Sequence, residues 1–462
     1  MPETDPWNLA PRRIALHVKI LIGLVLGAML GLSANALARL PVVAGETNAA
    51  DLNANGVHDR LEWVALNLTE PAGRVFLRLM FMVVLPLVFS ALALAVVEIG
   101  DVRRLGRIGL RTLFFTALLA TTAVVLGITL VNLIRPGYAL PAEKRDELAK
   151  RYAAGASTSV EQARKAKPIR DLLVDMLPEN PMQELAGAID GSSKGNGMLA
   201  VMVFALIFGA AITAAPEQCR MLVGWLEGLN AISMVIIGWA MRLAPLGAGC
   251  LVFSITARLG MDILVTLFWF VLTVLLGLGL HLGVTYPVVL TLCSPIRPAR
   301  FFRGVREAML VAFGTSSSSA TLPTAIKVAE VDLQLPHEIS RFVLTVGATG
   351  NQNGTALYEG VVVLFMAQVF GVELSTAQQI QVVLMSILAG VGTAGVPGGS
   401  LPLIVVLMQS VGIPGEGIGI IMGIDRVLDM CRTVLNVTGD LVVATCVASP
   451  AQPLANPPAP GD

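Results

Sequence analysis

Long apolar runs dominate the chain, and most of them are long enough to cross a lipid bilayer. Spanning helices are predicted at 20–37, 76–99, 108–134, 198–215, 222–246, 262–292, 342–370 and 417–448. These runs lack the strict alternation of barrel strands, and lipid offers backbone groups no partners outside a helix or a closed barrel. The pattern therefore predicts an all-α polytopic membrane protein with eight transmembrane helices.

Two further apolar segments are broken by polar or glycine-rich centres. The segment 302–330 contains Ser316–Ser319, and the segment 381–411 is interrupted by Gly390–Ser400. Each half has only about 10–14 residues, too short to cross a bilayer alone, and polar tips at membrane depth need protein or water around them. We interpret both segments as re-entrant helical hairpins; the alternative is a pair of kinked core helices.

Each broken segment precedes an unusual span. The run 342–370 is interrupted by the polar stretch Gly347–Thr355, and the run 417–448 carries several charges. A hairpin followed by an interrupted or charged helix thus occurs twice in the chain. This arrangement is expected of a transporter built from inverted repeats.

Composition supports a membrane location and excludes a water-soluble globular protein and a nucleic-acid binder. The 462 residues are 55% hydrophobic and 14% charged, with 32 basic and 32 acidic side chains and no net charge. Soluble domains carry roughly 25% charged residues, and nucleic-acid binders need a basic excess. The five cysteines and four histidines stand at no disulfide, redox or zinc spacing.

The distribution of arginine predicts the orientation. Arginines crowd the link after the second span, at 103–111, whereas acidic residues prevail in the link 45–66 after the first span. By the positive-inside rule, the N-terminal segment 1–13 is cytoplasmic, in a multi-pass protein of the inner or plasma membrane. The stretch 136–197 is expected to form a long external loop, and the Pro/Ala-rich tail 449–462 to be disordered.

The last run carries its polar residues on one face. At about 100° per residue, these side chains fall within an arc of roughly 100°; they are Asp425, Asp429, Arg432, Thr433, Asn436 and Asp440. An ionised residue at a helix centre costs about 2.5–3.5 kcal/mol on insertion scales, so the stripe lines a wet site or finds partners. Arg432 suits a carboxylate, Asp429 an ammonium and Asp440 a hard cation. The alternative is a salt-bridge ladder that only holds helices together.

From about residue 14 to 447 the chain resembles the dicarboxylate/amino acid:cation symporter family, which includes glutamate and aspartate transporters. The matching motifs are 316–323, 347–358, 392–397 and 429–440. The resemblance implies eight spans, two hairpins, a homotrimer, and in each protomer a scaffold domain and a mobile transport domain that works as an elevator. Helices 1–6 would occupy 14–300, with helices 3 and 6 in the transport domain, and the transport core would occupy 301–448.

The resemblance implies cation-coupled symport of glutamate or aspartate, and no enzymatic activity. Carried over by motif, the substrate-binding residues are Ser317, Ser318, Thr355, Val396, Gly399, Asp429, Arg432, Thr433 and Asn436. Arg432 argues for acidic substrates, and Asp429 argues for amino acids over plain dicarboxylates. The alternative is a proton-coupled C4-dicarboxylate symporter with little or no sodium dependence. A channel would need no such site, and a serine hydrolase on Ser316–Ser319 lacks a nucleophile elbow and a facing histidine.

The resemblance also implies Na⁺, H⁺ or both as coupling ions. Its cation-binding positions are Gly347, Thr349, Asn351, Gly390, Val391, Thr393, Asn436 and Asp440. A third sodium site of the family is predicted to be absent. Asn353 stands where the family has an aspartate, and Leu119 and Ala120 stand where hydroxyl-bearing residues are usual. Hard cations need oxygen ligands and negative charge.

Two further ionisable residues lie within the last two predicted spans, 342–370 and 417–448. Glu359 lies one turn after Thr355 inside an apolar span, where desolvation favours the protonated carboxyl. Family members with glutamate here often move a proton, and we predict the same; the alternative is a glutamate paired with a neighbouring donor. Many prokaryotic members have an arginine where Ser316 stands. Arg426 either replaces that charge or is a structural partner of Asp425.

The external link contains a 12-residue stretch, 51–62, that fits the EF-hand pattern D-x-[DN]-x-[DN]-G-x5-E. Its predicted ligands for Ca²⁺ are Asp51, Asn53, Asn55, the carbonyl of Val57, Asp59 and Glu62. Such a site would act as a structural clip and not as part of transport. The alternative is a polar Asn/Gly turn that matches the pattern by chance.

Overall fold

The computed structural model describes residues 16–38, 57–100, 107–146, 148, 177–187, 198–392 and 400–448. Every helix or strand element assigned in these ranges is a helix, which confirms the all-α prediction. The N-terminal segment, most of the predicted calcium loop, the tip of the second predicted hairpin and the tail 449–462 lie outside the described residues.

Five helices within the described ranges are long and apolar enough to cross a membrane, judged by length and composition. They are α1 (Leu16–Leu37), α5 (Arg107–Ile134), α10 (Pro216–Leu259), α11 (Met261–Leu280) and α20 (Met422–Ala448). The span that begins with α11 continues through η4 (His281–Thr285) and α12 (Tyr286–Cys293). Several apolar helices in one chain make this a multi-pass membrane protein.

The remaining predicted runs take other forms. The run 76–99 divides into α3 (Glu70–Met82) and α4 (Val84–Gly100), and the run 198–215 is the 17-residue helix α9 (Met198–Ala214). The run 222–246 is only the middle of α10, which has 44 residues. Pro216 begins α10, and Gly260, with a φ of 66°, ends it. The apolar run therefore indicated the position of α10 but not its length.

The span 342–370 is broken inside its polar motif. Helix α16 (His337–Gly350) ends before Asn351, and α17 (Asn353–Val369) begins after Gln352. Neither linking residue has helical dihedral angles. The break leaves terminal carbonyls of α16 and terminal N–H groups of α17 without partners in their own helices. This exposes backbone polar groups in the middle of the molecule, beside α20.

The two segments predicted to be hairpins consist of short helices. The first contains α14 (Arg306–Thr315) and α15 (Ser318–Lys327), joined by Ser316, which has a left-handed φ of 51°, and Ser317. The second contains α18 (Thr376–Gly392) and α19 (Leu401–Ser410). The other elements are α2 (Asp59–Val64), η1 (Ala65–Thr69), η3 (Pro136–Ala139), α8 (Pro181–Gly187), α13 (Pro298–Gly304), η5 (Val328–Asp332) and η6 (Gly415–Ile420).

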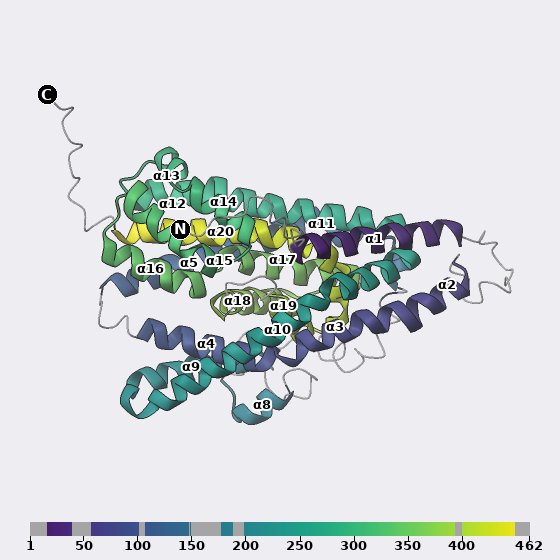
Figure 1. Cartoon of the computed structure of the whole chain (residues 1–462), viewed down its shortest axis with the longest axis horizontal. Helices are drawn as coiled ribbons and strands as arrows, with labels where there is room; N and C mark the ends of the chain where they lie inside the picture. The colour runs from purple at the N-terminus through teal and green to yellow at the C-terminus, as the bar shows by residue number, and fades with distance from the viewer. Residues whose placement is uncertain are drawn as a thin grey trace, which may run out of the picture.

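Helix α20, yellow in Figure 1, runs lengthwise through the molecule and contacts α5, α11 and α14–α17. A second group of contacts joins α1, α3, α4 and α9 to α10. Three glycines on one face of α1 let its backbone approach α10 closely. A Cβ at Gly27 would collide with the carbonyl oxygen of Gly249. Small residues at such contacts allow helix packing in a membrane.

Candidate substrate and cation site

The ionic part of the site lies on the first half of α20. Arg432 is completely buried, and its Nη2 atom donates to Asp425 Oδ1 at 3.2 Å and to Asp429 Oδ1 at 2.9 Å. Asp425, Asp429 and Arg432 follow one another at spacings of four and three positions, so they share one face of the helix. The structure therefore brings together the acidic and basic residues that the sequence places on one stripe.

Arg432 also stacks on the neighbouring helix. Its guanidinium carbon lies 3.9 Å from the ring centroid of Tyr358 in α17. Its Nε and Nη1 atoms are buried and have no hydrogen-bond partner in the described part of the chain. Each buried unpaired donor costs about 1–3 kcal/mol. The free donors indicate a position where a carboxylate of a solute would be stabilised.

Arg426 pairs with Asp429, and no ion pair joins it to Asp425 in the described residues, so the alternative of a structural pairing with Asp425 is not what the structure shows. Its Nη1 atom lies 3.2 Å from Asp429 Oδ2. Adjacent residues on a helix point about 100° apart, whereas residues three apart are neighbours on its surface. Asp425, Arg426 and Asp429 face a small cavity between α20 and helices α1, α3 and α10.

One turn further along α20, Asn436 joins the two halves of the broken span. Its Oδ1 atom accepts from the Gly354 N–H at 2.7 Å, and its Nδ2 donates to Gln352 Oε1 and to Thr355 Oγ1. Thr433, also buried, donates its hydroxyl to the Asp429 carbonyl at 2.8 Å. Asn436 and Thr355 are therefore in direct contact. Gln352 completes this contact by accepting from Asn436 Nδ2.

A third cluster surrounds Asp440. Its Oδ1 accepts from Asn351 Nδ2 at 2.7 Å, and a Cβ at Gly347 would lie 2.7 Å from its carboxyl carbon. No basic side chain in the described ranges lies within 4.0 Å of the buried Asp440 carboxylate. The Asn351 Oδ1 atom is buried and has no hydrogen-bond partner among the described residues. Oxygen atoms around an uncompensated carboxylate are the ligand set that a hard cation prefers.

The other predicted cation positions are less completely described. A Cβ at Gly390 in α18 would lie 3.4 Å from the Gln352 carbonyl oxygen, so α18 approaches the break in the span 342–370. Val391 follows it and is half-buried, and Thr349 lies in α16, where its side chain is not described. Thr393, with the predicted substrate residues Val396 and Gly399, lies outside the described residues.

Glu359 is completely buried in α17, and neither carboxyl oxygen has a hydrogen-bond partner in the described part of the chain. The alternative prediction, a glutamate paired with a neighbouring donor, is therefore not what the structure shows. A carboxyl group without donors is far more stable protonated than ionised in such surroundings.

The turn between α14 and α15 places Ser317 and Ser318 in a buried position. Ser317 caps α15 by accepting from the Ala320 N–H at 3.1 Å, and both helices contact α20. The hydrogen bonds of Arg432 go to Asp425 and Asp429 and not to this turn. The serines thus lie in a turn whose two helices contact the helix that carries the ionic residues.

Two aromatic residues near Asn353 were not anticipated from the sequence. Tyr286 donates its hydroxyl to the Leu435 carbonyl at 2.9 Å, and Asn353 Nδ2 lies 3.4 Å from the same hydroxyl. His281 packs against the Tyr286 ring, with centroids 4.8 Å apart. Their only sequence signal is a histidine and a tyrosine inside an otherwise apolar run. Asn353, the departure that predicted loss of a third cation site, is thus engaged with a tyrosine.

The described part of the predicted calcium loop does not support a calcium site. Asp51, Asn53 and Asn55 lie outside the described residues. Val57 and Asp59 are described, and Asp59 begins α2. Glu62, predicted as the bidentate ligand, is buried in α2 with its Oε1 3.6 Å from Nε of Arg258. An arginine at the end of α10 therefore lies beside the carboxylate that the EF-hand pattern assigns to the ion.

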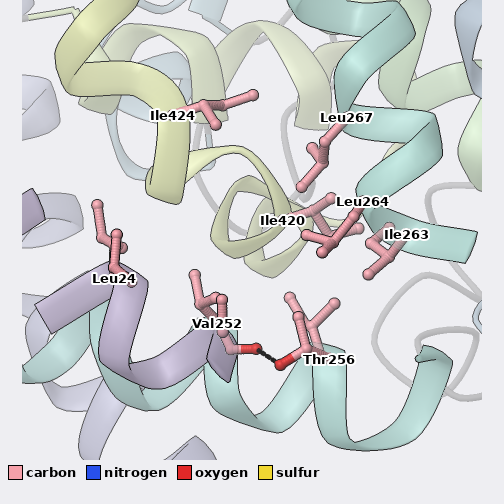
Figure 2. A pocket seen from close by; sticks show the side chains of 11 residues that line it. Leu24, Val252, Thr256, Ile263, Leu264, Leu267, Ile420 and Ile424 are labelled. Atoms are coloured by element: carbon pink, nitrogen blue, oxygen red, sulfur yellow. Dashed lines mark hydrogen bonds between the residues drawn. The ribbon is translucent and has the colours of Figure 1, made fainter. Parts of the chain in front are cut away.

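A separate apolar pocket lies between α1, α10, α11 and the start of α20 (Figure 2). Leu24, Val252, Leu267 and Ile424 are among its lining residues, and its one hydroxyl, on Thr256, donates to the Val252 carbonyl at 2.7 Å. It carries no charged side chain, so it is unsuited to a solute with carboxylates. The charged and polar groups that could bind an acidic solute therefore lie on α20 and the helices that contact it.

Several spanning helices around a buried set of charged residues are typical of a membrane transport protein. The chain belongs to the sodium:dicarboxylate symporter family, whose profile matches residues 16–449. This confirms the family resemblance, and the family consists of symporters.

Individual relatives cover most of the chain. It is 31% identical over 382 residues to the proton/sodium-glutamate symport protein of Bacillus subtilis, covering 82% of this chain and 85% of the relative. It is 31% identical to the proton/glutamate-aspartate symporter of Escherichia coli, covering 84% and 87%. It is 32% identical to excitatory amino acid transporter 3 of Oryctolagus cuniculus, covering 80% and 76%.

Proposed function

We propose that this protein is a secondary active transporter that carries glutamate or aspartate across the cell membrane together with cations. The observation that supports this most directly is Arg432, fully buried with two unpaired donors and one turn away from Asp429. A guanidinium and a carboxylate at this spacing complement the side-chain carboxylate and the ammonium of an acidic amino acid. The names of the three relatives agree with this substrate class.

The proposed binding mode follows from the two donors of Arg432 that have no partner in the described residues and from the negative charge of Asp429 beside them. The substrate side-chain carboxylate accepts from Nε and Nη1 of Arg432, and the ammonium donates to Asp429. Surrounding polar groups complete the contacts with the solute. They are Thr433, Thr355, Asn436, the serines Ser317 and Ser318, and Val396 and Gly399 of the second hairpin tip.

Coupling to sodium is assigned to the cluster around Asp440. Asn351, Gly347 and Asn436 lie beside it and contribute oxygen ligands, and the ion supplies the positive charge that the buried carboxylate lacks. A second sodium site uses Thr349, Gly390, Val391 and Thr393. A third site is absent in this proposal, because Asn353 carries no charge and contacts Tyr286.

Coupling to protons is assigned to Glu359. It lies on α17 one turn after Thr355, close to the substrate position, and no donor in the described residues neutralises it. A carboxyl group that is protonated while buried and ionises when water reaches it can carry one proton per transport cycle.

The movement is proposed to be that of an elevator in a homotrimer. Residues 301–448, together with the third and sixth spans, would form the mobile domain with two re-entrant hairpins. The rest of 14–300 would form the scaffold, with the N-terminus cytoplasmic. Helix α20 contacts α5, α11 and α14–α17 more extensively than it contacts α1 and α10, which supports this division.

A second candidate is a proton-coupled carrier of C4-dicarboxylates. One observation favours it: Asp429 is held by two arginines, and two guanidinium groups could bind two carboxylates. Succinate as a competitor distinguishes this candidate, because it has no ammonium to pair with Asp429.

The test is uptake of labelled aspartate and glutamate into proteoliposomes, with sodium and proton gradients imposed separately. We expect accumulation against the substrate gradient, driven by either ion gradient, with little competition from succinate. Succinate accumulation that exceeds that of aspartate and ignores sodium would support the dicarboxylate candidate. Uptake that never exceeds equilibrium would contradict secondary active transport. The Arg432→Gln variant serves as the matched inactive control.

A further inference from the structure

Both oxygens of the Asp429 carboxylate are occupied by arginines of its own helix. Oδ1 accepts from Arg432 Nη2 at 2.9 Å, and Oδ2 lies 3.2 Å from Arg426 Nη1. An ammonium group that binds Asp429 must therefore displace one of the two arginines, or share an oxygen with it. Which arginine moves follows from how each of them is held.

Arg432 is the immobile member of the pair. Its side chain has no exposed surface, it is bonded to two aspartates, and it stacks on Tyr358. The Arg426 side chain is 14% exposed, has Asp429 as its one ion-pair partner in the described residues, and lines the small cavity beside α1 and α10. Its Nε atom is buried without a hydrogen-bond partner. Displacing Arg426 breaks one ion pair at the edge of the network.

We propose that Arg426 is a built-in counter-ion for the empty carrier: it neutralises Asp429 in the absence of substrate and yields this carboxylate to the substrate ammonium. This inference rests on the proposed transport of amino acids. Asp425 and Asp429 are balanced by Arg426 and Arg432, so the ionic cluster is electrically neutral without substrate. Removing Arg426 leaves Asp429 to share Arg432 with Asp425, with one buried negative charge uncompensated.

The consequence differs between the two halves of a transport cycle. The loaded carrier has an ammonium on Asp429 and does not need Arg426. The empty carrier, which must return across the membrane after releasing substrate, does need it, because an uncompensated carboxylate resists passage through a low-dielectric environment. Substrate exchange uses the loaded carrier alone, whereas net uptake also requires the return of the empty carrier.

The experiment compares net uptake and exchange of labelled aspartate in the same proteoliposomes, for the wild type, Arg426→Gln and Arg426→Lys. For Arg426→Gln we expect net uptake to fall by about tenfold or more, while exchange stays within about threefold and the KM for exchange does not rise. Arg426→Lys keeps the charge and should restore net uptake. Arg306→Gln, at an exposed arginine of α14, is the matched control and should leave both rates unchanged.

Retained exchange in Arg426→Gln shows that the variant is folded. An equal fall in exchange and net uptake would overturn the proposal in favour of a structural role. A tenfold rise in KM would overturn it in favour of a direct contact between Arg426 and a substrate carboxylate, and unchanged net uptake would also overturn it. If the wild-type protein neither exchanges nor accumulates acidic amino acids, the proposed function fails as well, and that result is distinct from the other three.

Discussion

The guanidinium carbon of Arg432 lies 3.9 Å from the centroid of the Tyr358 ring, so a buried arginine of α20 stacks on an aromatic residue of α17. This contact joins the broken span to the charged helix at the proposed substrate position. A cation–π contact is worth about 2 kcal/mol or more when it is desolvated, and stacking leaves the in-plane donors of the guanidinium free. Tyr358 therefore holds Arg432 without using its free donors at Nε and Nη1.

Replacement of the Tyr358 ring should weaken substrate binding. For Tyr358→Leu we expect the KM for aspartate to rise by about tenfold or more, because about 2 kcal/mol of cation–π attraction that positions Arg432 is lost. Tyr358→Phe keeps the ring face and should stay within about threefold of wild type. Uptake kinetics in proteoliposomes measure both values. Equal losses in the two variants would show that the ring face is not the important feature.

Lysine should not replace Arg432. It keeps the positive charge but lacks the planar set of donors that contacts Asp425 and Asp429 and leaves two others for the substrate. We expect kcat/KM for aspartate to fall by about 100-fold or more in Arg432→Lys, in line with the cost of disturbing a buried charge pair. Arg306→Lys at an exposed position is the control. Activity within tenfold of wild type would mean that charge alone suffices.

Asp440 should determine the sodium dependence. Asp440→Asn keeps the shape of the side chain but removes the buried negative charge beside Asn351. Because hard cations need charged oxygen ligands, we expect the sodium concentration for half-maximal uptake to rise by about tenfold or more. Titration of uptake with sodium at saturating aspartate measures this value, with the exposed Asp332→Asn as control. An unchanged sodium requirement would place the ion elsewhere.

Glu359 should determine the dependence on a pH gradient. Its carboxyl has no partner in the described residues, so burial favours the protonated form, and the proton must leave when the group becomes hydrated. Glu359→Gln resembles the protonated carboxyl permanently and cannot release a proton. Uptake by this variant should lose its stimulation by an inwardly directed proton gradient while sodium stimulation remains. Full retention of the proton-driven component in Glu359→Gln would exclude this carboxyl as the carrier.

The contact between α1 and α10 should tolerate no side chain at Gly27. A Cβ there would collide with the backbone of Gly249, so Gly27→Ala is expected to destabilise the protein by about 1–3 kcal/mol. Gly228 in α10 has no atom within 4 Å of an added Cβ, so Gly228→Ala should be neutral or stabilise by about 0.5–1 kcal/mol. Thermal unfolding of the detergent-solubilised protein compares the two. A lower Tm for Gly228→Ala than for Gly27→Ala would contradict the packing described here.

Much of the fold is local in origin and could be predicted. The apolar runs indicated helices, and the polar motif 347–355 contains the break at Asn351 and Gln352. The lengths of helices were less predictable. Helix α10 extends well beyond its apolar run because the packing of α1, α3 and α4 along it stabilises turns that hydropathy does not mark.

The sequence by itself determined that this is a helical membrane protein with a charged stripe on its last helix, because helix periodicity and the cost of burying charge act on each segment separately. Only the tertiary structure decided which groups meet: Tyr358 with Arg432, Glu62 with Arg258, and Asn353 with Tyr286, 67 residues away. Such pairings depend on how helices from distant parts of the chain are positioned. The EF-hand pattern shows the difference, since its last carboxylate matches the spacing for calcium yet lies against an arginine that only folding brings there.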